Sequence, residues 1–439
     1  MLIGSFFLSC LARQFYYRFM KKVLISGMIG NALEWYDYAL YAQFATIIGK
    51  HFFPESNIRE ILTFAVFAAG FFVRPLGAVI FGNIGDKFGR RIALAIGILT
   101  MAIPTAAIGL LPSYETIGIA APIILTIIRL IQGFSLGGEF SGCIAYIVES
   151  SPKEYRGLAG SAAFISMCLG MLFGTLTAAL FRNVMDESSL FNWGWRIPFI
   201  AGLFIGLVGL YIRWHLKESP IYQAAKSTGN LSKAPLRDLL NNNMKELFIG
   251  MGIYLTVTVP FYIVTVYIDS YMQQIGYSAQ IANYTNIATL ISMIIALPLS
   301  AYISDKIGRK TIMITGCISF ALFSYPLFWI MNHTTCSCSA IIAAGALAFI
   351  AGFFMGPVPT VLVELFPTRV RFTGVAVSYN MSAAIFGGTA PMVSMILMKE
   401  FGDKTVMSYY ITIFVVFTML ALMYYKETFK NSLYDEPNR

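Results

Sequence analysis

The sequence predicts an all-α integral membrane protein in which twelve transmembrane helices form two six-helix pseudo-repeats. Three observations support this fold class. Of the 439 residues, 57% are hydrophobic and 12% are charged, about half the charged fraction of a soluble domain. The apolar residues gather in stretches of about 20, the length that crosses a bilayer as a helix. Short charged motifs also recur in the two halves of the chain.

Twelve apolar stretches are long enough to span a membrane. We expect each of them to be a helix, because a helix satisfies its own backbone hydrogen bonds where water is absent. In chain order they are residues 23–48, 61–84, 92–112, 118–148, 158–181, 196–214, 246–271, 281–303, 311–331, 340–364, 372–398 and 406–425.

The distribution of Lys and Arg orients these spans. An even number of spans places both chain ends on one side of the membrane. With both ends inside, the inner segments hold 23 of the 31 Lys and Arg residues, and the outer loops hold five. Cytoplasmic loops carry such an excess, so we expect both termini in the cytoplasm. The net charge of +9 has the same origin, and no basic run interleaved with polar surface indicates a nucleic-acid partner.

The spans divide the chain into five predicted parts. They are a cytoplasmic N-terminal segment (1–22), a first bundle (23–214), a basic cytoplasmic linker (215–245), a second bundle (246–425) and a short cytoplasmic tail (426–439). Met20 opens the string MKKVLISG, which resembles a natural start, so both Met1 and Met20 are candidate first residues.

Two pairs of matching motifs indicate an internal duplication. GNIGDKFGRR (82–91) matches AYISDKIGRK (301–310), and ESSPKEYR (149–156) matches ELFPTRVR (364–371). The partners are 219 and 215 residues apart and follow equivalent spans. Parallel six-helix repeats are one architecture of secondary transporters, whose substrate site lies between the halves near mid-membrane.

These motifs also carry a family resemblance. The paired D-K-x-G-R-R and D-K-x-G-R-K loops resemble the signature of the major facilitator superfamily. Further strings narrow the resemblance to its metabolite:proton symporters, and IGLLPSYETIGIAAPIIL (108–125) is similar to the proline/betaine transporter branch. The resemblance covers residues 23–426, and the other strings are GNALEWYDYALY (30–41), RPLGAVIFGNIGDKFGRR (74–91), IQGFSLGGEFSG (131–142), WGWRIPF (193–199) and LKESPIY (216–222).

The resemblance implies a secondary active transporter and not an enzyme. It implies proton-coupled uptake of a small zwitterionic or carboxylate solute, such as proline or glycine betaine, by alternating access. A di- or tricarboxylate such as 2-oxoglutarate or citrate is the alternative, and sodium coupling also stays open. No cofactor is expected, since a proton gradient supplies the driving force. The resemblance further implies a monomer in a bacterial inner membrane.

One departure from the branch concerns the C-terminus. The osmosensory proline/betaine transporter has a long C-terminal coiled coil, whereas about a dozen residues follow the last span here. Three or four heptads are needed for such a coil, so we expect no osmotic activation through this element.

Ionisable residues inside the spans are the candidates for proton coupling. Such residues are costly at membrane depth and are functional by default. Glu34, Asp37 and Glu139 are the three candidates, all in the first half. At 100° per residue, Glu34 shares a polar stripe of span one with Asn31, Tyr38 and Tyr41. The alternative for Glu34 and Asp37 is a structural salt bridge to Arg74 or Arg129.

Substrate contacts are expected from arginines and aromatic side chains. Arginine is favoured for carboxylate recognition, and aromatic faces bind quaternary ammonium groups. As alternatives, Arg74 pairs with Asp37, Arg196 anchors the start of span six, and the aromatic residues pack. The glycines of span four, Gly133, Gly137, Gly138 and Gly142, favour close helix packing. The candidates for substrate binding are Arg74, Arg129, Arg196, Gln132, Trp35, Tyr38 and Tyr41.

The repeated loops are candidates for a gate on the cytoplasmic side. Asp86 can cap the positive N-terminus of a neighbouring helix, which the resemblance identifies as span eleven in the other half. Anchoring by positive charge alone explains neither Asp86 nor the glycines. Because Ala301 stands where the first copy has Gly82, we expect a looser second contact. The candidate gating residues are Gly82, Asp86, Lys87, Gly89, Arg90, Arg91, Asp305, Lys306, Gly308 and Arg309.

Overall fold

The structure is a computed structural model that describes residues 2–56 and 59–434, with side chains from residue 20 onward except at positions 60, 61, 64 and 67. Parts of the predicted N-terminal segment and of the predicted tail (435–439) therefore lie outside the described residues. Every regular element in the described part of the chain is helical, as the composition predicts.

Eleven helical segments of the described chain are long and apolar enough to cross a membrane. They coincide with predicted spans two to twelve. Spans seven, ten and eleven each contain more than one element. The main elements are α3 (Arg59–Phe88), α4 (Arg90–Leu110), α6 (Ala120–Glu149), α7 (Arg156–Val184), α9 (Arg196–Trp214), α12 (Met244–Phe261), α14 (Ala279–Ile307), α15 (Arg309–His333), α16 (Ser337–Met355), α17 (Val358–Leu365), α18 (Arg371–Ser382), α19 (Ala390–Phe401) and α20 (Val406–Tyr424).

Predicted span one falls in α1 (Leu2–Gln43) and α2 (Ala45–Phe52) and is not among these eleven segments. Its hydropathy is low because Asn31, Glu34 and Asp37 interrupt the apolar residues. All three side chains are fully buried, and α1 packs along α7. These three polar side chains therefore face protein, which is how a helix with two carboxylates is accommodated inside a membrane bundle.

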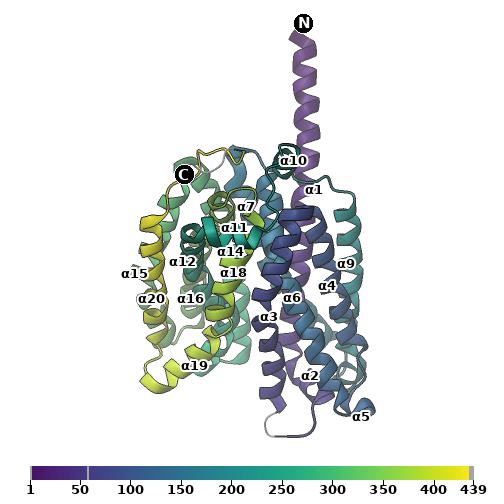
Figure 1. The fold of residues 1–439 in the computed structure, drawn as a ribbon. Coiled ribbons are helices and arrows are strands. Elements are labelled where there is room, and N and C mark those ends of the chain that lie inside the picture. The colour runs from purple at the N-terminus through teal and green to yellow at the C-terminus, as the bar shows by residue number, and fades with distance from the viewer. Residues whose placement is uncertain (1, 57–58, 435–439) are drawn as a thin grey trace.

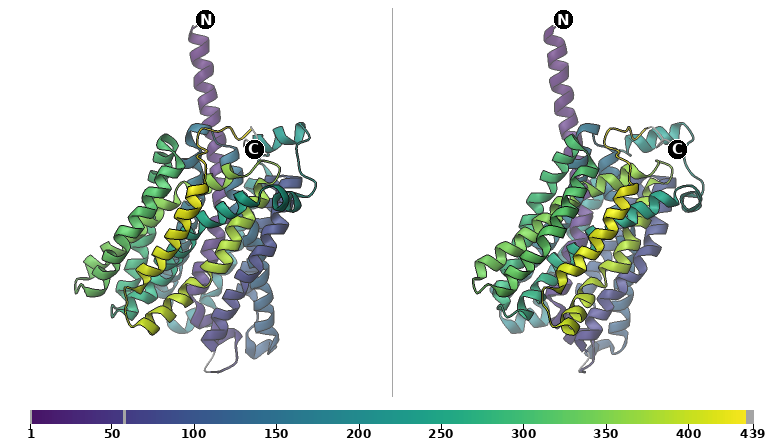
Figure 2. Two further views of the ribbon diagram at one scale, coloured as in Figure 1. Left: turned by 60° about the vertical axis from the view of Figure 1, so that its left-hand side comes forward. Right: turned by 90° about the vertical axis from the view of Figure 1, so that its left-hand side faces the viewer.

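The two halves of the chain stand side by side. In Figure 1, α1, α3, α4, α6 and α9 lie on the right and α12, α15, α16, α19 and α20 on the left. Both chain ends lie at the same end of the molecule in all three views (Figures 1 and 2), here called the terminal end. The linker holds α10 (Pro220–Ser227) and α11 (Pro235–Asn242). At the terminal end α11 contacts both α3 and α18, so the linker touches both halves.

Two spans of the second half change their helical pitch midway. After α12, the chain continues through the π-helical turn η3 (Tyr262–Tyr267) to α13 (Ile268–Gln274), and after α18 through η4 (Ala383–Gly387) to α19. Such π-turns occur often at functional sites. The remaining short elements are α5 (Tyr114–Ile117), η1 (Lys153–Tyr155), α8 (Glu187–Ser189) and η2 (Leu190–Gly194).

Glycines bring α3 and α6 into close contact, which confirms the predicted packing role for span four. A Cβ atom built on Gly133 would lie 2.1 Å from the carbonyl oxygen of Gly70. A Cβ on Gly137 would lie 2.5 Å from the carbonyl oxygen of Arg74. No side chain fits at either position, so the backbones of the two spans touch directly.

We predict that Gly137→Ala lowers the thermal stability of the purified protein. The added methyl group would meet backbone atoms, and overpacking of this kind costs about 1–3 kcal/mol. Gly345→Ala in α16 is the matched control, because a Cβ there meets nothing within 4 Å. Thermal unfolding in detergent measures both variants, and an equal effect of the two substitutions would contradict the close packing.

Candidate functional site

A small cavity lies between the two halves. Its walls include Trp35 of α1, Tyr254 and Phe261 of α12, Tyr262 of η3 and Tyr379 of α18. Its volume is about 10 Å³, which is the room of one water molecule. The structure therefore holds an aromatic-lined cavity at the interface in a closed state.

Arg74 lies beside this cavity and binds only neutral groups. Its Nε donates to Oδ1 of Asn380 at 3.3 Å, and its Nη2 donates to the hydroxyl of Tyr379. Its guanidinium carbon lies 5.3 Å from the ring centre of Phe71 and 5.1 Å from that of Tyr379. Each of the other buried arginines in the described residues has a carboxylate within 4 Å. Arg74 has none.

Asp37 is committed to Arg129. The carboxylate lies 2.5 Å from Nη1 of Arg129, and Gln132 donates to the same carboxylate at 3.1 Å. Gln132 also donates to Thr105 at 2.9 Å, and Arg129 stacks 3.8 Å from the ring centre of Tyr41. Of the alternatives that the sequence leaves open, the structure therefore shows the salt bridge between Asp37 and Arg129.

Glu139 is paired with Arg213, which lies near the end of predicted span six (196–214). Arg213 is fully buried in the last turn of α9 and donates to both carboxylate oxygens of Glu139, at 3.0 Å for Nη1–Oε2. A Cβ on Gly30 would collide with both side chains of this pair. This partner of Glu139 was missed in the sequence, because a basic residue at the end of a span is typical of the cytoplasmic membrane surface.

Glu34 differs from the other two carboxylates. Its side chain is fully buried, and neither carboxylate oxygen has a hydrogen-bond partner among the described residues. Asn31, one turn earlier on the same face, donates to the carbonyl of Ala163 and to the hydroxyl of Ser166 in α7. The predicted polar stripe is thus buried between α1 and its neighbours, with Glu34 unpaired within it.

The remaining predicted contacts separate into two groups. Trp35 lines the cavity, and Tyr38 lies with its ring centre 5.7 Å from those of both Trp35 and Phe71. Arg196 lies away from the cavity and donates to the carbonyls of Gly109 and Leu111 at 3.0 and 2.7 Å. The structure therefore shows the anchoring alternative for Arg196.

At the terminal end, Asp86 joins the two halves. Its carboxylate accepts hydrogen bonds from the backbone N–H groups of Phe372 and Thr373, at 3.1 and 2.9 Å, at the start of α18. A Cβ on Gly82 would lie 2.8 Å from Cα of Thr373, so the glycine permits this close approach. The predicted contact with span eleven is present.

A buried charge cluster surrounds this contact. Glu149 accepts hydrogen bonds from Arg90 and from Arg371, each at 3.0 Å, so one carboxylate of the first half holds arginines of both halves. Arg90 also lies 3.2 Å from Asp86. Anchoring of basic residues at the membrane surface does not account for this cluster. Three of its four charged side chains are fully buried, and all four are compensated by charges within the protein.

The second copy of the motif repeats the contact in the opposite sense. Asp305 accepts hydrogen bonds from the backbone N–H groups of Gly157 and Leu158, at 2.8 and 2.9 Å, at the start of α7. A Cβ on Gly157 would lie 2.8 Å from the carbonyl oxygen of Ala301. The expectation of a looser contact was therefore wrong, because the partner helix supplies the glycine that the loop lacks.

The repeated motif contains a glycine, Gly89 in the first copy and Gly308 in the second, because the backbone conformation requires one. Their φ angles are 112° and 106°, a region that L side chains rarely adopt. The exposed Lys87 and Lys306 lie outside the cluster; Lys306 stacks on the ring of Tyr302 at 4.2 Å.

A third repeated pair was missed in the sequence. Glu218 accepts a hydrogen bond from the backbone N–H of Arg91 at 3.1 Å, and Glu427 accepts one from Lys310 at 2.9 Å. The next residues, Ser219 and Thr428, donate to Glu149 and Glu364 at 2.5 and 2.7 Å. Burial raises the pKa of the Glu218 carboxyl. The matching strings KES (217–219) and KET (426–428) were the available signal.

Tyr379 and Asn380 were also missed, although they bind the arginine beside the cavity. Both are fully buried in α18, where the string VSYNMS interrupts an apolar span. Neutral polar residues are common in membrane helices as interhelical contacts, so the string carried little weight. Their position opposite Arg74 is visible only in three dimensions.

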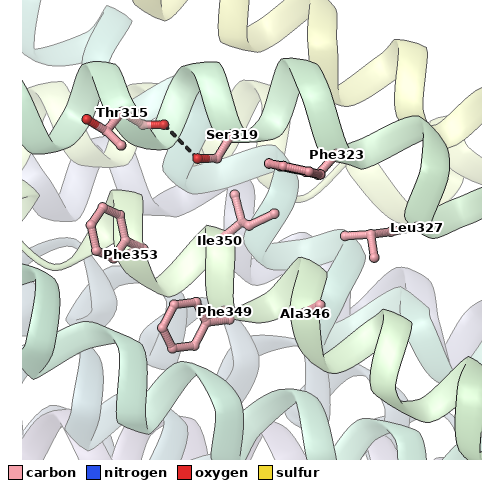
Figure 3. A pocket seen from close by; sticks show the side chains of 8 residues that line it. All are labelled: Thr315, Ser319, Phe323, Leu327, Ala346, Phe349, Ile350 and Phe353. Atoms are coloured by element: carbon pink, nitrogen blue, oxygen red, sulfur yellow. Dashed lines mark hydrogen bonds between the residues drawn. The ribbon is translucent and has the colours of Figure 1, made fainter.

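A larger hollow of about 420 Å³ lies between α15 and α16 (Figure 3). Thr315, Ser319 and Phe323 line one side, and Phe349 and Phe353 line the other. Its lining contains no charged residue, so it offers no partner for a carboxylate. It also lies within the second half, whereas a transported solute must reach the interface between the halves.

The fold and the site define an integral membrane transporter whose two halves meet at an aromatic-lined cavity. Within this class, the chain belongs to the major facilitator superfamily, whose family model matches residues 27–388. The solved structure of the proton:xylose symporter XylE of E. coli has the same fold, with a TM-score of 0.75, 20% identity, and coverage of 93% of this chain and 95% of that one.

Curated relatives place the chain more closely. It is 36% identical over 420 residues to a putative proline/betaine transporter of Staphylococcus aureus, covering 92% of this chain and 88% of the relative. It is 33% identical over 423 residues to the glycine betaine/proline/ectoine/pipecolic acid transporter OusA of Dickeya dadantii and to the proline/betaine transporter of Salmonella typhimurium, covering 93% of this chain and 84% of each. The chain is thus a transporter homologous to proline/betaine transporters.

We predict that Asp37→Asn and Arg129→Gln each destabilise the protein strongly. Either change leaves one buried charge without its partner, which costs about 3–5 kcal/mol. The double variant removes both charges, so its loss is expected to be smaller than the sum of the single losses. Unfolding of the purified variants in detergent measures this coupling, and additive losses would show that the ion pair is not the stabilising contact.

We predict that Asp86→Asn and Asp305→Asn open the terminal end to a similar extent. Each amide has one acceptor oxygen fewer and places N–H groups against the backbone N–H groups of a helix start. Spin-label distances between the ends of α3 and α18, and of α7 and α14, measure the opening, with exposed Lys306→Gln as the control. A clear effect of Asp86→Asn without one of Asp305→Asn would contradict the equal contacts.

Proposed function

We propose that this protein is a proton-coupled symporter that takes up proline, glycine betaine or a similar zwitterion. One observation carries the proposal: among the described residues, Arg74 is the one buried arginine with no carboxylate within 4 Å, and it lies beside an aromatic-lined cavity between the halves. The relatives named as proline/betaine transporters support the same substrate class.

A zwitterion matches both features of the site. A substrate carboxylate can bind the guanidinium of Arg74, since arginine presents a planar fork of donors to carboxylates. The substrate's ammonium group can lie against Trp35, Tyr254, Phe261 or Tyr262, since aromatic faces attract quaternary ammonium ions. The indole Nε1 of Trp35 has no hydrogen-bond partner among the described residues, so a second donor is available in the cavity wall.

A di- or tricarboxylate fits less well. Its several negative charges would need several uncommitted cations. Arg129 is neutralised by Asp37, and Arg196 is held at a helix end. One available positive charge supports a solute with one carboxylate.

The transport cycle follows from the closed cavity. About 10 Å³ cannot hold a solute of this size, so residues 23–214 and 246–425 must separate on one side to admit it. We infer that they rock as two units, with the Asp86 and Asp305 contacts closing the terminal end. The excess of Lys and Arg there supports a cytoplasmic location for this end. The protein then works as a monomer in the bacterial inner membrane and needs no cofactor.

We predict that proteoliposomes with the purified protein accumulate labelled proline or glycine betaine when an inward proton gradient is imposed. A protonophore is expected to abolish the accumulation, and an imposed sodium gradient alone is expected to drive none. Labelled 2-oxoglutarate is the comparison solute. Accumulation of 2-oxoglutarate without that of betaine or proline would overturn the proposed substrate class.

Arg74→Lys tests the carboxylate site. Lysine keeps the charge but loses the planar fork and the stacking on Phe71 and Tyr379, so we expect at least a roughly tenfold loss in uptake efficiency, the equivalent of one charged hydrogen bond. Arg196→Lys is the matched control, because Arg196 contacts only backbone carbonyls and the ring of Trp195. Equal losses in the two variants would remove Arg74 from the site.

A further inference from the structure

We propose that Glu34 carries the coupled proton, and that coupling arises because ionised Glu34 and the substrate carboxylate compete for the one positive charge of Arg74. This inference rests on the proposed function and names the group within the site that binds the proton. It excludes Asp37 and Glu139 from that role.

The first step is the difference between the three carboxylates. Asp37 and Glu139 each touch an arginine, so each is stable in its ionised form inside the bundle. Glu34 is equally buried, but both of its oxygens lack a partner among the described residues. An isolated buried carboxylate is far more costly than a neutral carboxylic acid. The closed state described here is therefore the state in which Glu34 holds a proton.

The second step is the position of Arg74 relative to Glu34. Tyr38, one turn after Glu34, contacts the ring of Phe71, which lies one turn before Arg74. The helices α1 and α3 run in opposite directions through the bundle. One turn from this ring contact toward the terminal end, Glu34 on α1 and Arg74 on α3 thus reach the same depth. The charge of Arg74 therefore acts on Glu34 from the facing helix.

The third step concerns the other charges around Glu34. Asp37 lies on the same helix, Glu139 faces it from α6, and Arg74 faces it from α3. Because Asp37 and Glu139 are neutralised by their own arginines, Arg74 supplies the unbalanced charge. The other titratable neighbours are Cys143 on α6 and the hydroxyls of Tyr38, Tyr254, Tyr262 and Tyr379.

These steps define a coupling cycle. Without substrate and proton, ionised Glu34 is the counterion of Arg74. When a substrate carboxylate binds Arg74, Glu34 loses this counterion and takes a proton from the open side, which forms one O–H bond on its carboxylate. After the halves rock, the substrate leaves, Arg74 attracts Glu34 again, and the O–H bond breaks to release the proton inside. One proton, and hence one net positive charge, moves with each zwitterion.

The test uses Glu34→Gln in the full chain, reconstituted into liposomes. Glutamine resembles the protonated acid, so we expect exchange of labelled for unlabelled glycine betaine to continue, while accumulation driven by an imposed proton gradient is lost. In the wild type, betaine affinity is expected to fall about tenfold per pH unit above the titration of Glu34, and in the variant it is expected to be independent of pH. Proton-driven accumulation by Glu34→Gln would overturn the proposal.

Two further variants separate coupling from structural damage. Glu34→Asp keeps a titratable group and is expected to retain gradient-driven accumulation. Asp37→Asn leaves Arg129 unpaired and is expected to lose exchange and accumulation together. If Glu34→Gln lost exchange as well, and Glu34→Asp lost accumulation, the proton would not be carried at this position.

A measurement without substrate distinguishes the inference from the proposed function. The infrared spectrum of the purified protein is expected to show a buried carboxylic acid band that disappears in Glu34→Gln and persists in Asp37→Asn. If the wild type transported neither betaine nor proline, the substrate assignment would fail while this band still located the proton. Persistence of the band in Glu34→Gln would overturn the role of Glu34.

Discussion

Neutralisation of buried arginine charges is the constraint on which this structure depends. A guanidinium inside a membrane bundle needs a carboxylate or a dense set of acceptors. Within the first half, the pairs Asp37–Arg129 and Glu139–Arg213 tie α1 to α6 and α6 to α9. Because each pair is buried, the helices that carry it are held at fixed depth and rotation. The first half is thereby a rigid frame around the site.

The same constraint acts between the halves at the terminal end, with a different result. Glu149 holds Arg90 of its own half and Arg371 of the other, and Glu364 of the second half lies near both Arg309 and Arg156. Since each cluster contains charges from both halves, separation there must expose them to water or re-pair them. Water at the membrane surface can replace such contacts, which makes this end suited to open and close as a unit.

Much of this organisation could be predicted from the sequence. Apolar length located spans two to twelve, charge bias oriented them, and the family resemblance identified span eleven as the partner of Asp86. Arg213 was missed as the partner of Glu139, because a basic residue at the end of a span is typical of the cytoplasmic membrane surface. Tyr379 and Asn380 escaped notice because neutral side chains give no signal of depth. The unpaired state of Glu34 could not be predicted, since it depends on which helices α1 meets and at what rotation, whereas the presence of two carboxylates in span one was plain.

The neutrality of the second half at the site has a mechanical consequence. The second half approaches Arg74 through Asn380 and Tyr379, and its other cavity residues are aromatic or small. Separating neutral groups from Arg74 desolvates no second charge, so each half can move without breaking an ion pair at mid-membrane. The two ionisable groups of the site that lack an ion-pair partner among the described residues, Arg74 and Glu34, both lie in the first half. In the proposed cycle, binding of a substrate carboxylate and a proton therefore changes the charge balance of one half, while the other half closes over the substrate by packing and neutral hydrogen bonds alone.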